Sequence, residues 1–220
     1  MNPANLLNPE QWWTLFLDWL LAQAVAGAGG LPAAEQVAAE ALREATGDRA
    51  QAIETIIWWR TGHAAGLGML AALPMGLLSI VGISTSLAAT YLLGANTAAA
   101  IAIVQGYDVN SAAVRSLILL TLLGGSATQM LKKAGLEVSD RVSVHLLNQL
   151  PAHLLRQINQ HLGYRLFTVG AQKGVFSVTT VVPVVSGLVG GAIDAAYVYQ
   201  CAQVAKQVFE RPVAEEPTSV

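Results

Sequence analysis

The chain has 220 residues, of which 54% are hydrophobic and only 12% are charged. Soluble domains carry about 25% charged residues, so this composition indicates a protein that associates with a membrane or buries a large core. The formal net charge of −2 argues against nucleic acid as a partner, because phosphate binding needs a clustered positive field.

The N-terminal part of the chain is predicted to be helical. Residues 8–10, Asn-Pro-Glu, are typical of a helix start, with a candidate cap, a first-turn proline and an acid at the positive end of the helix dipole. The residues that follow are apolar around most of the helix circumference and include Trp12, Trp13 and Trp19. We predict that residues 1–24 form an amphipathic helix, which lies either at a membrane interface or on the protein core.

Two further helices are predicted before the long uncharged stretch. Glycines and Pro32 break the chain over residues 26–32, an Ala-rich amphipathic helix follows over 33–45, and Gly47 ends it. The next helix is predicted over 48–61. It is expected to place Ile53, Ile56, Ile57 and Trp58 on one side and Arg49, Glu54 and Arg60 elsewhere.

Residues 61–107 contain no Asp, Glu, Lys or Arg. Their number is about twice the roughly 20 residues that one membrane-spanning helix requires, so a hairpin that turns near its midpoint is predicted. Pro74 and Gly76 in the first arm would kink the helix and let backbones approach closely. The second arm is predicted over 87–105 and would end at Gly106.

After the hairpin, a helix is predicted over 112–123, capped by Asp108 or by Asn110 and Ser111. The following tract carries three histidines at intervals of eight residues, which is not the i, i+4 spacing that places two metal ligands on one helix face. No Cys or carboxylate cluster completes a site, so we expect no metal. These histidines are His145, His153 and His161.

Charge is unevenly distributed along the chain. Residues 108–173 hold seven Lys and Arg against three Asp and Glu, whereas residues 1–63 hold three against seven. A basic segment beside apolar hairpins is predicted to lie against anionic lipid headgroups at the cytoplasmic side of a membrane. The alternative is an ordinary solvated face. The candidate headgroup contacts are Lys132, Lys133, Arg141, Arg165 and Lys173.

A second uncharged stretch covers residues 174–193. Its length favours a proline-kinked helix or a re-entrant hairpin about Pro183, and a separate helix is predicted over 194–209. A central proline, a Gly/Ser joint and an Ala-Ala-Tyr or Ala-Ala-Thr-Tyr helix follow one another here as they do in 61–107, which indicates two paired hairpins. The glycines predicted to pack these helices are Gly187, Gly190 and Gly191.

These elements predict an all-α protein with one helical domain over residues 25–210. The domain would be built around the hydrophobic hairpins 61–107 and 174–209. A short tail over 211–220, with two Pro and two Glu, is expected to be disordered.

Short Gly, Pro and apolar motifs recur along the chain. They are Thr61-Gly62, Gly66, Gly68, Leu73-Pro74, Gly106-Tyr107-Asp108, Arg115, Leu122-Leu123-Gly124 and the block 182–194. In this order they resemble the EcsC family of bacterial proteins, with Ser186 where the family pattern has Gly. The resemblance covers roughly residues 25–210, and its C-terminal block is similar to the membrane helices attached to some bacterial GTPases. It implies a helical, membrane-associated protein, encoded in one lineage with an ABC transporter, and it brings no catalytic residues.

The chain lacks the patterns that an enzyme would need. It has no Walker-type loop, no nucleophile elbow and no paired carboxylates within the apolar region, so we expect neither catalysis nor a cofactor. The best ionisable candidates border the apolar segments, and capping or end-anchoring is their predicted role. They are Asp108, Arg115, Lys173 and Asp194.

Three functional hypotheses follow. The first is an accessory protein that docks or inserts its hairpins at the inner face of the bacterial membrane, with lipid and a membrane protein as partners. The second is a pore-forming or membrane-inserting protein that conceals its hairpin in water, and the third is a carrier of lipid or acyl chains. The single cysteine, Cys201, and the lack of a positively charged N-terminal region both suit a cytoplasmic location at that membrane.

Overall fold

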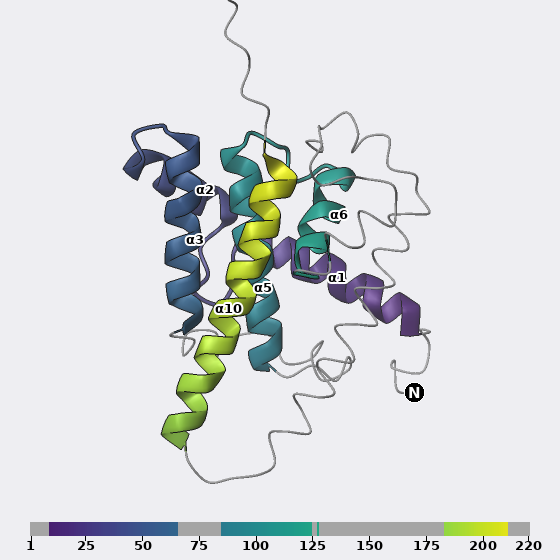
Figure 1. The fold of residues 1–220 in the computed structure, drawn as a ribbon. Helices are drawn as coiled ribbons and strands as arrows, with labels where there is room; N and C mark the ends of the chain where they lie inside the picture. Colours follow the sequence, from purple (N-terminus) through teal and green to yellow (C-terminus); the bar gives the residue numbers. More distant parts are fainter. Residues whose placement is uncertain (1–8, 66–84, 125–126, 128–182, 211–220) are drawn as a thin grey trace, which may run out of the picture.

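The computed structural model describes residues 9–65, 85–124, 127 and 183–210, and these residues are almost entirely helical (Figure 1). No strand occurs within these ranges, which confirms the predicted all-α class. The two predicted hairpins are not tested, because 66–84 and 174–182 lie outside the described residues. The helices are α1 (Pro9–Ala26), α2 (Ala34–Glu44), α3 (Arg49–Ala65), α5 (Thr85–Val104), α6 (Ala112–Thr121) and α10 (Pro183–Phe209).

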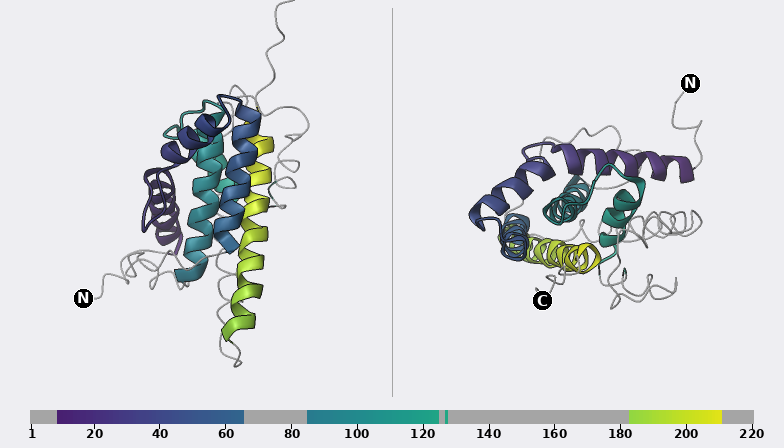
Figure 2. Two further views of the ribbon diagram at one scale, coloured as in Figure 1. Left: turned by 90° about the vertical axis from the view of Figure 1, so that its left-hand side faces the viewer. Right: turned by 90° about the horizontal axis from the view of Figure 1, so that it is seen from above.

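Helix α5 is the centre of the described fold. Helices α1, α2, α3, α6 and α10 all contact it, and the view along the bundle shows them arranged around it (Figure 2). Every side chain from Ala88 to Ala102 is buried. This helix is the predicted second arm of the first hairpin, and because it carries no charged residue it can be enclosed on all sides at no cost in buried charge. The neighbouring helices, rather than solvent, cover it.

Helix α1 packs on α5 through one of its faces. Phe16, Leu20 and Ala24 on that face are fully buried, whereas Asp18 is exposed. The side-chain amide of Asn96, at the middle of α5, donates hydrogen bonds to the carbonyl of Ala24 at 2.7 Å and to that of Pro32 at 3.0 Å. One face of the described part of α1 therefore packs on the core, and Asn96 fixes the connection from α1 to α2.

Two predicted helix ends, at Gly47 and Gly106, are found at the predicted positions. Gly47, with φ of +90°, follows α2, and Gly106, with φ of +77°, follows α5. A left-handed conformation of this kind favours glycine because other residues meet a steric penalty there. Ser111 caps α6, since its hydroxyl accepts a hydrogen bond from the Val114 amide at 3.3 Å.

Helix α10 differs from the prediction of a joint followed by a separate helix from residue 194. The structure has one continuous helix from Pro183 to Phe209. Pro183 begins the helix instead of kinking it, because the missing N–H of a proline would have no partner in the first turn. Gly187, Gly190 and Gly191 lie within the helix, where each costs about 1 kcal/mol relative to Ala. Helix α10 as a whole packs against α3 and α5.

Candidate functional site

Most of the residues proposed from the sequence as lipid contacts or kinks lie outside the described residues. These are Pro74, Gly76, Lys132, Lys133, Arg141, Arg165 and Lys173. Three predicted border residues, Asp108, Arg115 and Asp194, do lie among the described residues. Their contacts, given below, show that they do not form one site.

The border residues have separate roles. The Asp108 carboxylate accepts a hydrogen bond from the Asn110 amide at 2.9 Å and so shapes the turn before α6. Arg115 of α6 lies 4.0 Å from the Asp18 carboxylate of α1; the Arg115 side chain is partly buried and the Asp18 side chain is exposed. Asp194 lies in the middle of α10 and is buried. Asp194 follows the uncharged stretch in the sequence, as predicted, but because the helix continues through it to Pro183 it caps no helix end.

Three large apolar side chains are exposed on the neighbouring helices α3 and α10. Lys206 of α10 donates a hydrogen bond to the Glu54 carboxylate of α3, which pairs the start of α3 with the end of α10, so the two helices run in opposite directions. Trp58 is one turn beyond Glu54 and is 80% exposed. On α10, Tyr199 is 48% exposed and Ile193 is 52% exposed.

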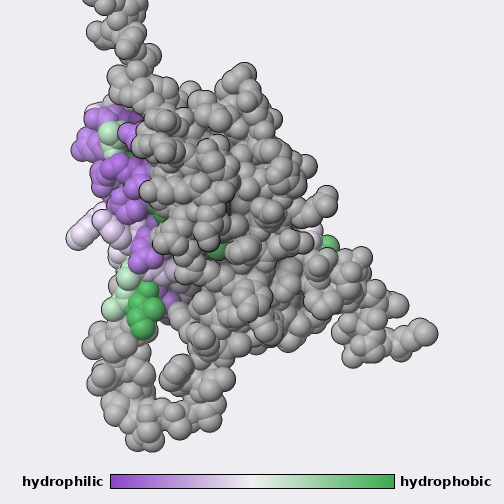
Figure 3. Space-filling view, turned by 45° about the vertical axis from the view of Figure 1, so that its right-hand side comes forward, coloured by the Kyte–Doolittle hydropathy of each residue, from purple (hydrophilic) through white to green (hydrophobic). Residues whose placement is uncertain are grey.

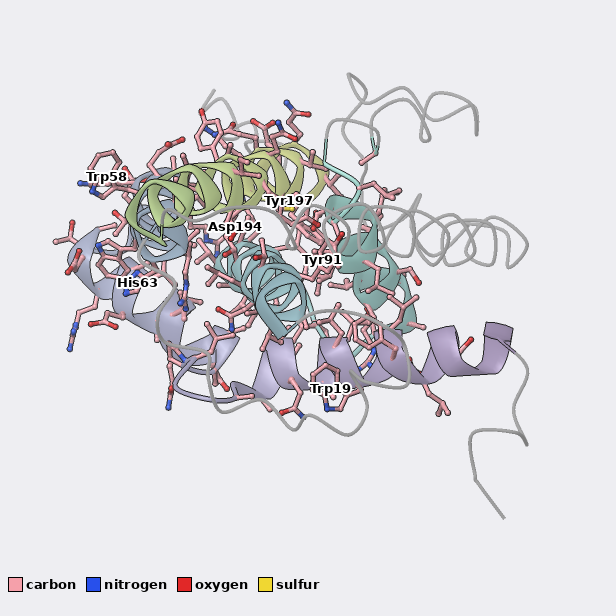
Figure 4. The ribbon with its side chains drawn as sticks, turned by 90° about the horizontal axis from the view of Figure 1, so that it is seen from below. Trp19, Trp58, His63, Tyr91, Asp194 and Tyr197 are labelled. Carbon is pink, nitrogen blue, oxygen red and sulfur yellow. The ribbon has the colours of Figure 1, made fainter. Side chains whose placement is uncertain are left out.

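We call this surface the uncharged face. It comprises the exposed residues of α3 and α10, apart from His63, that follow Glu54 and precede Lys206. On α10 these residues extend around the helix from the side of α3 to Gln200, whose side chain lies beside Gly124 at the end of α6. Figure 4 shows Trp58 pointing away from the bundle beside α10, and Figure 3 shows a small hydrophobic area at the lower left end of the coloured surface with hydrophilic colouring above it. The members of the uncharged face are Trp58, Gly62, Ala192, Ile193, Ala196, Tyr199 and Gln200.

Charged residues do occur on these two helix segments, but they are buried. Segments 58–64 and 191–205 contain two such residues, Arg60 and Asp194. They are 5% and 8% exposed, respectively. His63, on another side of α3, is exposed and its Nδ1 lies 2.7 Å from the Trp59 carbonyl oxygen. The uncharged face therefore presents apolar, aromatic and amide groups to its surroundings.

The predicted position of Trp58 was wrong. It was expected beside Ile53, Ile56 and Ile57, which are indeed buried, but it lies outside the core. The apolar side of α3 continues instead to Arg60 and Ala64, because residues 53, 56, 60 and 64 recur at helical spacing. If Arg60 is assigned to the buried side of α3 together with residues 53, 56 and 64, helical periodicity predicts that Trp58 is exposed.

The inner side of α10 is held to α5 and α6 by aromatic and hydrogen-bonding contacts. The Tyr197 hydroxyl donates to the Leu122 carbonyl at 2.7 Å, and its ring meets that of Tyr91 edge to face at a centroid distance of 5.4 Å (Figure 4). Cys201 is completely buried next to Gly94. Burial raises the pKa of the Cys201 thiol to about 12, although a hydrogen bond with Tyr197 opposes this shift. The thiol is therefore neutral at physiological pH and is no nucleophile.

The described residues offer no group of three His, Cys, Asp or Glu that could hold a metal ion. The histidines considered in the sequence, His145, His153 and His161, lie outside that part of the chain. Likewise, no helix within the described ranges is long and apolar enough to cross a membrane.

Comparisons with known proteins add no relative. No family model, no curated protein and no solved structure matches the chain. The candidate site consists of the uncharged face and the buried groups behind it.

Proposed function

We propose that this protein is a non-catalytic, EcsC-like accessory protein that docks at the inner face of a bacterial membrane through the uncharged face. The observation that carries the proposal is the exposure of Trp58, Ile193 and Tyr199 on two neighbouring helices whose charged residues in the same segments are buried. Such a surface is poorly suited to water but well suited to the boundary between headgroups and acyl chains.

The side chains of the uncharged face match the chemistry of that boundary. Trp and Tyr are enriched at the headgroup level of bilayers, because an apolar ring can enter the lipid while a polar atom stays near water. Ile193 adds apolar area, and Gln200 adds an amide that can bond to headgroups or water. Exposed apolar residues gathered on one surface, in contrast to scattered ones, mark interaction sites.

Binding to lipid vesicles tests this proposal. We expect Trp58→Ala and Tyr199→Ala each to weaken co-sedimentation with phosphatidylcholine vesicles, because each removes buried aromatic area from the docked state. Leu15→Ala is the matched control, since Leu15 is an exposed apolar residue, 47% accessible, on α1. Equal binding by wild type, the aromatic variants and the control would refute docking through the uncharged face.

A second candidate function is supported by the enclosure of α5. A helix without charge whose side chains from Ala88 to Ala102 are all buried is suited to a protein that conceals an apolar segment in water and releases it into a bilayer. Cys201 reports on this release, because its thiol lies in the contact between α5 and α10.

If α5 is released, vesicles should accelerate the reaction of Cys201 with a thiol reagent and should leak an enclosed dye. Vesicle binding with no leakage and no change in thiol reactivity would leave docking as the function and remove insertion. Because wild type has one cysteine, the thiol measurement needs no engineered residue, and Cys201→Ala provides its blank.

A further inference from the structure

Arg60 is a buried charge with little to balance it. The side chain is 5% exposed, on the core side of α3 between Ile56 and Ala64. Its Nε atom is buried and has no hydrogen-bond partner. Among the described residues, no carboxylate forms an ion pair with Arg60, and Asp194, the other buried charge, has an interaction of its own.

The nearest source of negative charge does not compensate for this burial. Desolvation lowers the pKa of the Arg60 guanidinium to about 10, and Glu40 on α2 raises it only in part. The Glu40 side chain is 56% exposed and lies 3.6 Å from Arg43, so water and a second cation share its charge. Arg60 therefore remains protonated at neutral pH while its environment favours the uncharged form.

We propose that Arg60 anchors a binding site for an oxyanion, either a carboxylate or a phosphate. A buried guanidinium is stabilised when its planar fork of N–H groups meets two oxygen atoms, and carboxylates and phosphates offer that geometry. Buried polar groups in folded proteins have partners, so the unpartnered Nε atom marks where such a ligand completes the structure. The adjacent Thr61 hydroxyl is a second buried group without a partner.

The position of Arg60 relates the site to the membrane. It lies two residues after Trp58 on α3 and faces the core, so in a docked protein it lies within one helix diameter, roughly 10 Å, of the headgroup level. An anionic lipid headgroup is then one source of the oxyanion, and the free ion is the other. The lipid source rests on the proposed docking function, whereas binding of a free ion does not.

Thermal unfolding in the presence of small oxyanions tests the site. We expect inorganic phosphate or acetate to raise the melting temperature of the wild type above its value in chloride at equal ionic strength. Arg60→Met should abolish this rise and should melt no lower than wild type in chloride, because it removes an uncompensated buried charge. Arg43→Gln, which removes an exposed arginine of α2, should keep the rise.

The same experiment distinguishes a ligand site from a structural arginine. A structural role predicts that Arg60→Met melts well below wild type in chloride, and that result, or an anion effect that survives the substitution, overturns the proposal. Glu40→Gln gives an independent measurement on an exposed residue. It should enlarge the anion effect, because it removes the carboxylate that competes for Arg60, and an unchanged or smaller effect also counts against the site.

Vesicles separate the two sources of the oxyanion and separate this inference from the docking function. Phosphatidylglycerol added to phosphatidylcholine vesicles should increase binding of the wild type, and Arg60→Met should lose only that increase. Trp58→Ala should weaken binding to both kinds of vesicle. If small anions and phosphatidylglycerol both act equally on wild type and Arg60→Met, the oxyanion site is refuted while docking stands or falls on Trp58 alone.

Discussion

At the scale of single residues, Gly94 shows how closely the central helix is packed. A Cβ atom at this position would lie 3.3 Å from the Cys201 sulfur and 3.3 Å from a methyl carbon of Leu122. Absence of a side chain therefore lets α10 and the end of α6 approach α5. Gly62 of α3 is the contrasting case, since nothing lies within 4 Å of the corresponding point.

These two glycines should respond in opposite directions to substitution. Gly94→Val should lower the free energy of unfolding by about 1–3 kcal/mol, because extra methyl groups overpack a close contact. Gly62→Ala should raise it by about 0.5–1 kcal/mol, because alanine favours the helix and meets no neighbour. Urea denaturation measures both, and a stable Gly94→Val variant would contradict the close contact.

Asn96 is the polar residue that ties the central helix to the chain around it. It is fully buried and donates to the carbonyls of Ala24 and Pro32. Asn96→Ala should lower the free energy of unfolding by about 1–3 kcal/mol, because two carbonyl groups lose a donor. Thr97→Val is the control, because the equally buried Thr97 hydroxyl bonds only within its own helix, to Leu93 at 2.7 Å. Its cost should stay within about 1 kcal/mol, and equal costs would show that the long-range bonds do not matter.

At the scale of elements, α6 offers a test of helix capping. Ser111→Ala should lower the free energy of unfolding by about 0.5–2 kcal/mol, because the Val114 amide loses the hydroxyl that caps it. Ser116→Ala on the same helix is the matched control. Its hydroxyl bonds to the Ala112 carbonyl four residues earlier, and alanine there improves helix propensity. Denaturation midpoints should fall for the first variant and stay level or rise for the second.

The pair α3 and α10 shows where periodicity alone was insufficient. The inner side of α10 has helical spacing, since Val198, Ala202, Ala205 and Phe209 are all buried. The spacing could not show that the helix begins at Pro183, because glycines and a proline suit a joint as well as a helix that packing supports. Apolar character also failed to predict the position of Trp58, because the charged residue Arg60, and not Trp58, lies on the buried side of α3.

At the scale of the whole molecule, Cys201 makes stability depend on pH. Its pKa rises from 9.0 to about 12 in the folded protein, so folding holds the proton more tightly than the unfolded chain does. The resulting stability is fully present below pH 9 and is lost as the pH rises toward 12, by at most about 1.4 kcal/mol per pH unit for one proton. Cys201→Ala should therefore lose less stability between pH 9 and pH 11 than wild type does.

Chemical denaturation at a series of pH values measures this difference directly. Other groups that titrate in the range are common to both proteins and cancel in the comparison. Identical pH profiles for wild type and Cys201→Ala would mean that the thiol is accessible to solvent in the folded protein, and would also withdraw Cys201 as a reporter of the contact between α5 and α10.

The all-α class, the helix stops at Gly47 and Gly106 and the helical second arm could all be predicted from sequence, because they depend on local propensity and on the period of apolar residues. The tertiary structure alone decided what covers each face. In the tertiary structure, five other described helices pack around α5, Arg60 is buried and Trp58 is exposed. Coverage depends on contacts between residues far apart in the chain, and an uncharged helix has the same composition whether lipid or protein surrounds it.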